Sequence, residues 1–190
     1  MTLFPHQISI AAELALRVYL HPEDWLVEEQ DGAVYIAFEG SDELDDWRRN
    51  FEFVLTTTDE HLGFGSYARQ LMTQMWAAGV VLDPAKPYVL CGHSLGGAVA
   101  TVVAAMLQGH LPSLHLVTFG SPRPGGRRFR ERLKVPHHRY VHGEDVVPHM
   151  PTALLGFRHA GPATELKEPH GWGLHGISDH SMAAYKRLVG

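Results

Sequence analysis

The sequence is poor in features that would cross-link the chain, carry it through a membrane or attract a polyanion. Its 190 residues include one cysteine, Cys91, so no intramolecular disulfide can form and the fold does not depend on an oxidising compartment. Net positive charge is absent too, because 16 Lys and Arg residues stand against 21 Asp and Glu residues, which gives a formal net charge of −5. We therefore predict no nucleic-acid partner.

Long hydrophobic runs are also missing. The longest stretch of apolar and small residues, 96–107, is well short of the roughly 20 residues that cross a bilayer as a helix, so we predict no transmembrane segment. The first twenty residues lack the basic start and the uninterrupted apolar stretch of a secretory signal, since Pro5, Glu13 and Arg17 interrupt them. We expect a cytoplasmic protein, or one exported without a recognisable signal peptide.

The remaining composition is that of one folded domain. Hydrophobic residues make up 45% of the chain and charged residues 19%, which is ordinary for a globular protein and excludes intrinsic disorder. A chain of this length buries a sizeable core but is short for two domains. We therefore interpret residues 1–190 as a single domain.

The apolar pattern alternates between helices and short strands. Asp31-Gly32 joins two apolar segments that favour β-structure, which predicts a hairpin near the start of the chain. From residue 64 onward helices and strands alternate, which favours an α/β fold class with a mostly parallel central sheet flanked by helices. The predicted helices are 8–19, 64–78, 95–107, 127–133 and 178–188, and the predicted strands are 25–29, 33–38, 88–91, 114–119 and 139–142.

A short motif bracketed by glycines carries the strongest chemical signal. Gly92-His93-Ser94-Leu95-Gly96 follows a predicted strand and opens a predicted helix, and this context gives the G-x-S-x-G pattern its meaning. The turn is so sharp that both glycines must lack side chains, while the Ser94 hydroxyl is expected to be exposed. A tight packing turn without chemistry is the alternative. A serine hydroxyl is a weak nucleophile near neutral pH, so a base and a group that orients this base should follow along the chain.

Fourteen histidines compete for the role of the base. In sites built on this type of turn, the acid and then the histidine follow the serine along the chain. Asp145 lies in a loop just after a predicted strand, and His180 stands at the start of the last predicted helix. We assign Ser94 as the nucleophile, His180 as the general base and acid, and Asp145 as the group that orients His180. Asp179 is poorly placed for that role and is interpreted as a helix cap, and His93 is interpreted as a packing residue.

Several further segments resemble the class 3 lipase family. Phe38-Glu39-Gly40-Ser41 is similar to the oxyanion loop of this family, His61-Leu62-Gly63-Phe64 to its His-x-Gly-Phe stretch, and Thr118-Phe119-Gly120-Ser121-Pro122-Arg123 to the strand and turn beyond the nucleophile. The Ser94 turn, the loop that begins at Asp145, and Asp179-His180 with Tyr185 match as well, so the resemblance extends from residue 38 to residue 185. It implies a compact α/β-hydrolase fold and a serine hydrolase, a lipase or esterase, that cleaves carboxylic esters of lipids or other acyl esters through an acyl-enzyme.

The resemblance also implies roles for the residues around the nucleophile. Ser94 would attack an ester carbonyl, and His180 would take its proton and deliver it to the leaving alcohol. The oxyanion of the tetrahedral intermediate would be met by the backbone N–H of Leu95 and by Ser41.

Residues 42–54 resemble the lid of the family. Leu44, Trp47 and Phe51 repeat at helical spacing and would face the acyl pocket. Six charged residues at positions 42–50 disfavour a strongly apolar open face. We therefore predict activity on soluble short-to-medium acyl esters with little interfacial activation. A fixed surface helix is the alternative for this segment.

Two other patterns allow both an ordinary and a functional interpretation. Six basic residues at positions 123–134 could make transient contact with an anionic lipid surface, although such a run is more often a solvated helix face. His170, His175 and His180 recur every five residues, which puts no two of them on one helical face, so we predict no metal site and no cofactor.

Two alternatives to a lipase or esterase remain at this stage. One is a phospholipase or aryl-ester esterase that uses the same triad. The other is a weakly catalytic lipid- or partner-binding module on the same fold, because a fold alone does not fix function.

Overall fold

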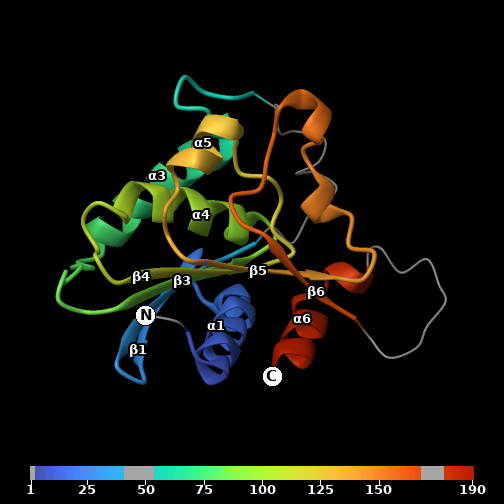
Figure 1. The fold of residues 1–190 in the computed structure, drawn as a ribbon. Coiled ribbons are helices and arrows are strands. Elements are labelled where there is room, and N and C mark those ends of the chain that lie inside the picture. Colours follow the sequence, from blue (N-terminus) through green and yellow to red (C-terminus); the bar gives the residue numbers. More distant parts are fainter. Residues whose placement is uncertain (1–2, 41–53, 168–177) are drawn as a thin grey trace.

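A sheet whose strands follow one another in chain order forms the centre of the molecule. The computed structural model describes residues 3–40, 54–167 and 178–190, and these contain a six-stranded sheet. β1 and β2 form an antiparallel hairpin, and the strands from β2 to β6 run parallel (Figure 1). The strands are β1 (Trp25–Gln30), β2 (Ala33–Phe38), β3 (Tyr88–His93), β4 (Leu114–Phe119), β5 (His137–His142) and β6 (Ala163–Leu166).

The turn of the hairpin has the backbone that its two residues predict. Asp31 and Gly32 both have positive φ values, 52° and 75°. This is the geometry of the type I′ turn, whose twist matches that of the paired strands and which favours Asp-Gly. The predicted hairpin is confirmed.

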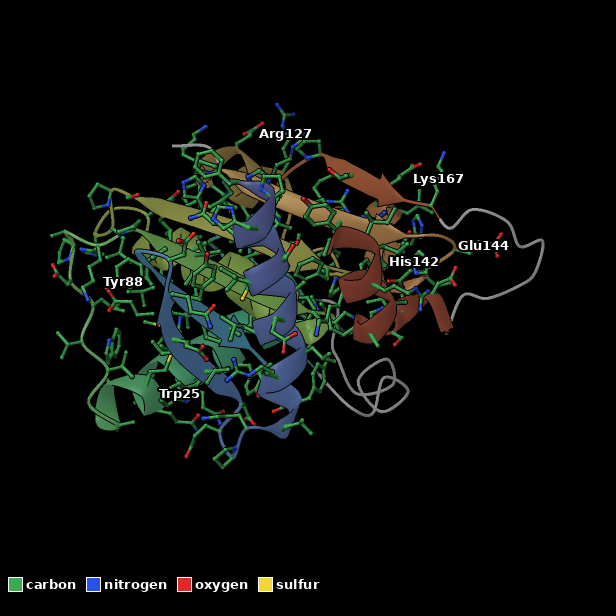
Figure 2. The ribbon with its side chains drawn as sticks, turned by 90° about the horizontal axis from the view of Figure 1, so that it is seen from below. Trp25, Tyr88, Arg127, His142, Glu144 and Lys167 are labelled. Carbon is green, nitrogen blue, oxygen red and sulfur yellow. The ribbon has the colours of Figure 1, made fainter. Side chains whose placement is uncertain are left out.

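Helices cover both faces of the sheet. α3 (Leu62–Ala77), α4 (Leu95–Leu107) and α5 (Arg127–Arg132) connect successive parallel strands and lie on one face. Right-handed crossovers in a sheet that grows in one direction all pass over the same side, which explains this placement. α1 (Pro5–Arg17) and α6 (Met182–Val189) pack against each other on the opposite face, as Figure 2 shows from below.

Alternate strand residues divide the core into two layers. On β2, Ile36 and Phe38 belong to the layer under α3 and α4, whereas Tyr35 and Ala37 belong to the layer under α1 and α6. Every residue of β2, β3 and β4 is buried, which is typical of parallel strands that are covered on both faces. In the part of the chain that the structure describes, none of the helices has the length and apolar character needed to cross a membrane.

The predicted α/β architecture is confirmed, with two differences beyond shifts of a few residues at the ends of elements. β6 was missed, because a four-residue edge strand whose first three residues are exposed carries no apolar pattern. The last predicted helix is divided into a 3-10 turn, Ser178–His180, and α6. Residues 41–53 and 168–177 lie outside the described residues, and so do the predictions made for Ser41, Leu44, Trp47 and Phe51 and for His170 and His175.

Candidate active site

Ser94 occupies the turn between β3 and α4. Its backbone angles, φ 53° and ψ −127°, are strained for a residue with a side chain. A Cβ on Gly92 would lie 2.4 Å from the carbonyl carbon of Gly96, and a Cβ on Gly96 would lie 2.1 Å from the carbonyl oxygen of Phe38. The prediction that both positions require glycine is therefore confirmed.

The expectation of an exposed Ser94 hydroxyl was wrong. The residue is only 2% exposed. Its backbone N–H donates to the carbonyl oxygen of Phe119, the last residue of β4, at 3.0 Å, and the Cβ of Ser121 lies next to Gly97. The strand-to-helix turn is therefore packed against the end of β4 and the residues that follow it.

Leu95 is the first residue of α4. Its backbone N–H has no carbonyl one turn back in the helix to which it could donate, and it lies at the positive end of the helix dipole. Gly40, the last described residue before position 41, lies against the same turn, since a Cβ there would be 2.9 Å from the carbonyl oxygen of His93. Among the described residues, this N–H beside Ser94 has no backbone acceptor.

Asp145 and His180 form a buried pair near the turn. His180 Nδ1 lies 2.8 Å from Oδ2 and 3.0 Å from Oδ1 of Asp145, and both residues are almost fully buried. Gly120, with φ 56°, makes room for the pair, because a Cβ there would lie 2.7 Å from Asp145 Oδ2 and 3.1 Å from His180 Cε1. A carboxylate only accepts hydrogen bonds, so Nδ1 carries the proton and Nε2 of the neutral ring is an acceptor.

Two other groups hold the carboxylate of Asp145. Tyr185 donates its hydroxyl proton to Oδ2 at 2.6 Å, and the Val147 N–H donates to Oδ1 at 2.9 Å. The Tyr185 oxygen in turn accepts the His142 N–H at 2.9 Å. Burial, followed by the charge of Asp145, raises the pKa of Tyr185 well above its usual value, so this hydroxyl remains a donor. No chemical role for Tyr185 was predicted from the sequence, because the position of a tyrosine on the buried side of a helix does not indicate its hydrogen-bond partner.

His93 supports His180 from the other side. Its Nε2–H donates to the carbonyl oxygen of His180 at 2.6 Å, its Nδ1 accepts the Tyr19 hydroxyl proton at 2.8 Å, and the two imidazole centroids are 4.5 Å apart. Burial and the neighbouring His180 lower the pKa of His93 well below its usual value, so the ring stays neutral. His93 thus does more than pack, because it fixes the backbone of His180.

Asp179 links the Asp145 loop to the segment that carries His180. Its Oδ2 accepts the Glu144 N–H at 2.9 Å, and its carbonyl oxygen accepts from His142 Nδ1 at 3.0 Å. The interpretation of Asp179 as a helix cap was wrong, because α6 begins only after Ser181.

The second ring nitrogen of His180 is available. Nε2 is buried and has no hydrogen-bond partner within residues 3–40, 54–167 and 178–190. A buried polar atom without a partner needs an explanation. As the unprotonated nitrogen of the ring, it can accept a proton from a nearby hydroxyl group.

The position of these groups defines the class of the protein. Ser94 lies at a strained strand-to-helix turn after β3 of a mostly parallel sheet. Asp145 lies in the loop after β5 and forms a buried pair with His180. This arrangement is the α/β-hydrolase fold.

The chain belongs to the class 3 lipase family, whose model, described as lipase (class 3), matches residues 35–155. It is 35% identical over 141 residues to secreted mono- and diacylglycerol lipase 1 of Fusarium solani, an alignment that covers 68% of this chain and 42% of that protein. It is 34% identical over 152 residues to a lipase of Rhizomucor miehei, which covers 70% of this chain and 41% of that protein. The chain thus spans about two fifths of the length of these relatives.

A solved structure has the same fold. The lipase from Rhizopus microsporus var. chinensis superimposes with a TM-score of 0.69 at 22% sequence identity, over 88% of this chain and 76% of that chain. At this level of identity the likeness concerns the fold.

Proposed function

We propose that this protein is a serine hydrolase that cleaves carboxylic esters of lipids through an acyl-enzyme. The observation that supports this function most strongly is the buried pair of Asp145 and His180, with Nδ1 2.8 Å from Oδ2, beside the strained turn of Ser94. Ser94 Oγ attacks the ester carbonyl carbon, and His180 Nε2 takes its proton and passes it to the leaving alcohol. Water, activated by the same nitrogen, then releases the carboxylic acid and restores the serine.

Each neighbouring group has a part in this scheme. Asp145 keeps the proton on Nδ1 and stabilises the imidazolium that forms when Nε2 is protonated. The oxyanion of the tetrahedral intermediate accepts from the backbone N–H groups of Leu95 and Ser41. Loss of one such donor typically costs about 2.7–4 kcal/mol of transition-state stabilisation, so these donors matter as much as the position of the base.

Acylglycerols are the substrate class that we propose. The name of the Fusarium relative, a mono- and diacylglycerol lipase, supports this choice. Leu44, Trp47 and Phe51 would form the apolar face over the acyl chain, and soluble short-to-medium esters would be accepted without a lipid interface. The exposed basic face of α5, with Arg127 and Arg128 outward and Phe129 buried, would make the transient contacts with a lipid surface.

Hydrolysis of p-nitrophenyl butyrate tests the proposed function. The assay uses a pH of about 8, where an unperturbed histidine is neutral and acts as a base. We expect Ser94→Ala to lower kcat by about 10⁴-fold or more, because the nucleophile is lost. Ser121→Ala is the matched control, since Ser121 is also buried but donates its proton to the carbonyl oxygen of Pro122.

The control should keep the rate of the unchanged protein. A folded protein without esterase activity on this and longer esters, or a Ser94→Ala variant as active as the control, would refute the proposal.

A further inference from the structure

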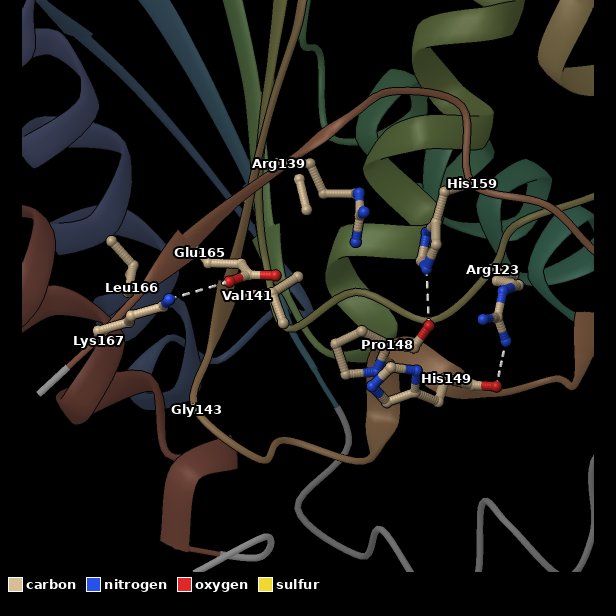
Figure 3. A pocket seen from close by; sticks show the side chains of 11 residues that line it. Arg123, Arg139, Val141, Gly143, Pro148, His149, His159, Glu165, Leu166 and Lys167 are labelled. Atoms are coloured by element: carbon tan, nitrogen blue, oxygen red, sulfur yellow. Dashed lines mark hydrogen bonds and ion pairs between the residues drawn. The ribbon is translucent and has the colours of Figure 1, made fainter. Parts of the chain in front are cut away.

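A cavity lies behind the loop that carries Asp145. It has a volume of about 330 Å³ and is bounded by β5, β6 and the segment around residues 148–159 (Figure 3). On β5, Arg139 and Val141 face this cavity, whereas Tyr140 and His142 face the opposite side, where α6 packs. The polar side chains that line it belong to Arg123, Arg139, His149, His159, Glu165 and Lys167.

Arg139 is the unusual residue of this cavity. It is only 8% exposed, and its Nε donates to the carbonyl oxygen of Gly161 at 3.2 Å. No carboxylate lies within ion-pair distance of it in the described ranges 3–40, 54–167 and 178–190. Burial, and then the charge of Arg123, lower the pKa of Arg139 below its usual value. A guanidinium that is removed from water without a counter-ion is costly, so a ligand that supplies negative charge would relieve this cost.

The surroundings of Arg139 add positive rather than negative charge. Arg123 uses Nη1 to donate to the carbonyl oxygens of His149 and Pro151, which holds its guanidinium at the cavity. His159 donates from Nε2 to the carbonyl oxygen of Pro148 at 2.7 Å, and burial together with the charge of Arg139 lowers its pKa to about 3, so its ring is neutral.

One carboxylate stands at the rim of the cavity. Glu165 is exposed and lies 3.7 Å from the ammonium group of Lys167, which balances its charge. The two guanidinium groups are therefore left without a matching anion among the lining residues.

We propose that this cavity binds a phosphate group, with Arg139 as its principal ligand. A planar guanidinium donates two parallel hydrogen bonds to an oxyanion, and a dianion balances two arginines better than a single carboxylate does. The volume exceeds that of a bare phosphate and is at the lower end of the range of small-molecule sites, so the organic part of a phosphate ester also has room.

The bound phosphate would touch the loop of the candidate catalytic acid. Gly143 and Pro148 line the cavity, and Asp145 lies between them in the chain. Phosphate binding at this cavity does not depend on ester hydrolysis, so direct binding measurements test it. Where the probe is a lipid ester, the Ser94→Ala variant is used so that the probe is not hydrolysed during the measurement.

Titration calorimetry at constant ionic strength provides the binding test. The probes are inorganic phosphate, glycerol 3-phosphate, and phosphatidylcholine vesicles with and without phosphatidic acid, with acetate as the singly charged comparison. We expect saturable binding of phosphate and not of acetate, and a loss of affinity of about 10-fold or more in Arg139→Gln. Arg17→Gln at the exposed end of α1, away from both the cavity and the basic face of α5, removes the same charge and should bind as the unchanged protein does.

A second measurement does not rely on a variant. In the unchanged protein, ring ¹⁵N signals of His159 should shift when phosphate binds, because a negative charge then lies beside Arg139. Tighter binding of phosphatidic acid vesicles than of glycerol 3-phosphate, if the extra affinity is lost in Arg139→Gln, identifies a lipid headgroup as the source, and the reverse order identifies a soluble phosphate ester. Absence of saturable phosphate binding, or an equal loss in both arginine variants, overturns the proposal.

Discussion

Replacing Tyr185 with phenylalanine removes one hydroxyl from the centre of the candidate site and keeps the shape of the ring. This hydroxyl donates to Asp145 Oδ2 at 2.6 Å and accepts the His142 N–H at 2.9 Å. Loss of a hydrogen bond to a charged group costs about 1.5–3 kcal/mol, and a buried N–H without a partner costs about 1–3 kcal/mol. We expect the free energy of unfolding to fall by about 2.5–6 kcal/mol, a large share of the stability of a small domain.

Tyr88→Phe is the matched control for this change. Tyr88 is 1% exposed, and its hydroxyl oxygen accepts the Asp83 N–H at 2.7 Å. Because Asp83 is exposed, water can replace the lost acceptor, so this change should cost about 0.5–1.5 kcal/mol. Urea denaturation of both variants measures the difference, which we attribute to the bond with Asp145 and to the buried His142 N–H.

The esterase assay separates a positioning role of Tyr185 from a purely structural one. Without its hydroxyl, Asp145 keeps the Val147 N–H and His180 as partners but is held less firmly. We expect kcat to fall by about 10- to 100-fold with little change in KM, whereas Tyr88→Phe keeps its kcat. Equal destabilisation of the two variants, or an unchanged kcat in Tyr185→Phe, would refute the reasoning that Tyr185 acts through Asp145.

Three further predictions concern single residues. Gly120→Ala places a Cβ 2.7 Å from Asp145 Oδ2 at a φ of 56°, so the esterase rate and the melting temperature should both fall; an unchanged rate would contradict this geometry. Burial lowers the pKa of His61 from 6.5 to about 4, so the unfolded chain binds the extra proton between these values. The free energy of unfolding should therefore be level above pH 6.5 and should decrease below it by up to about 1.4 kcal/mol per pH unit for this residue. The test variant is His61→Asn, which keeps a side chain that can cap the helix. Urea titrations at several pH values should show that its free energy of unfolding decreases less steeply below pH 6.5 than that of the unchanged protein. An identical decrease would disprove the lowered pKa of His61. Burial raises the pKa of the Cys91 thiol, so a disulfide reagent should label it only after unfolding; rapid labelling of the native protein would argue against a buried strand at this position.

The sequence predicted those parts of the structure whose signals are local. The helix at 95–107 and the strand at 114–119 were predicted with the observed bounds, because continuous apolar runs end there at turn residues. The chain order of serine, acid and histidine selected Asp145 and His180, which the fold brings to hydrogen-bond distance from 35 residues apart.

The contacts that support this pair could not be predicted in the same way. Tyr185 meets Asp145 across 40 residues, and Tyr19 meets His93 across 74 residues. Neither contact leaves a periodic or spacing signal, because each depends on how a helical segment packs on the sheet. The exposure of Ser94 was misjudged as well, because a short motif does not show which other segments pack around it.

The helices α1 and α6 pack against each other on the face of the sheet opposite to α3, α4 and α5. An ion pair between Glu13 and Lys186 joins the two helices. His180, the proposed base, stands two residues before α6 and so belongs to this outer layer, whereas Ser94 lies between β3 and α4. Because proteins open in cooperative parts, separation of this layer would carry His180 away from Asp145 while the remaining sheet and its helices stayed folded. Inactivation and loss of secondary structure would then occur at different concentrations of denaturant, with inactivation first.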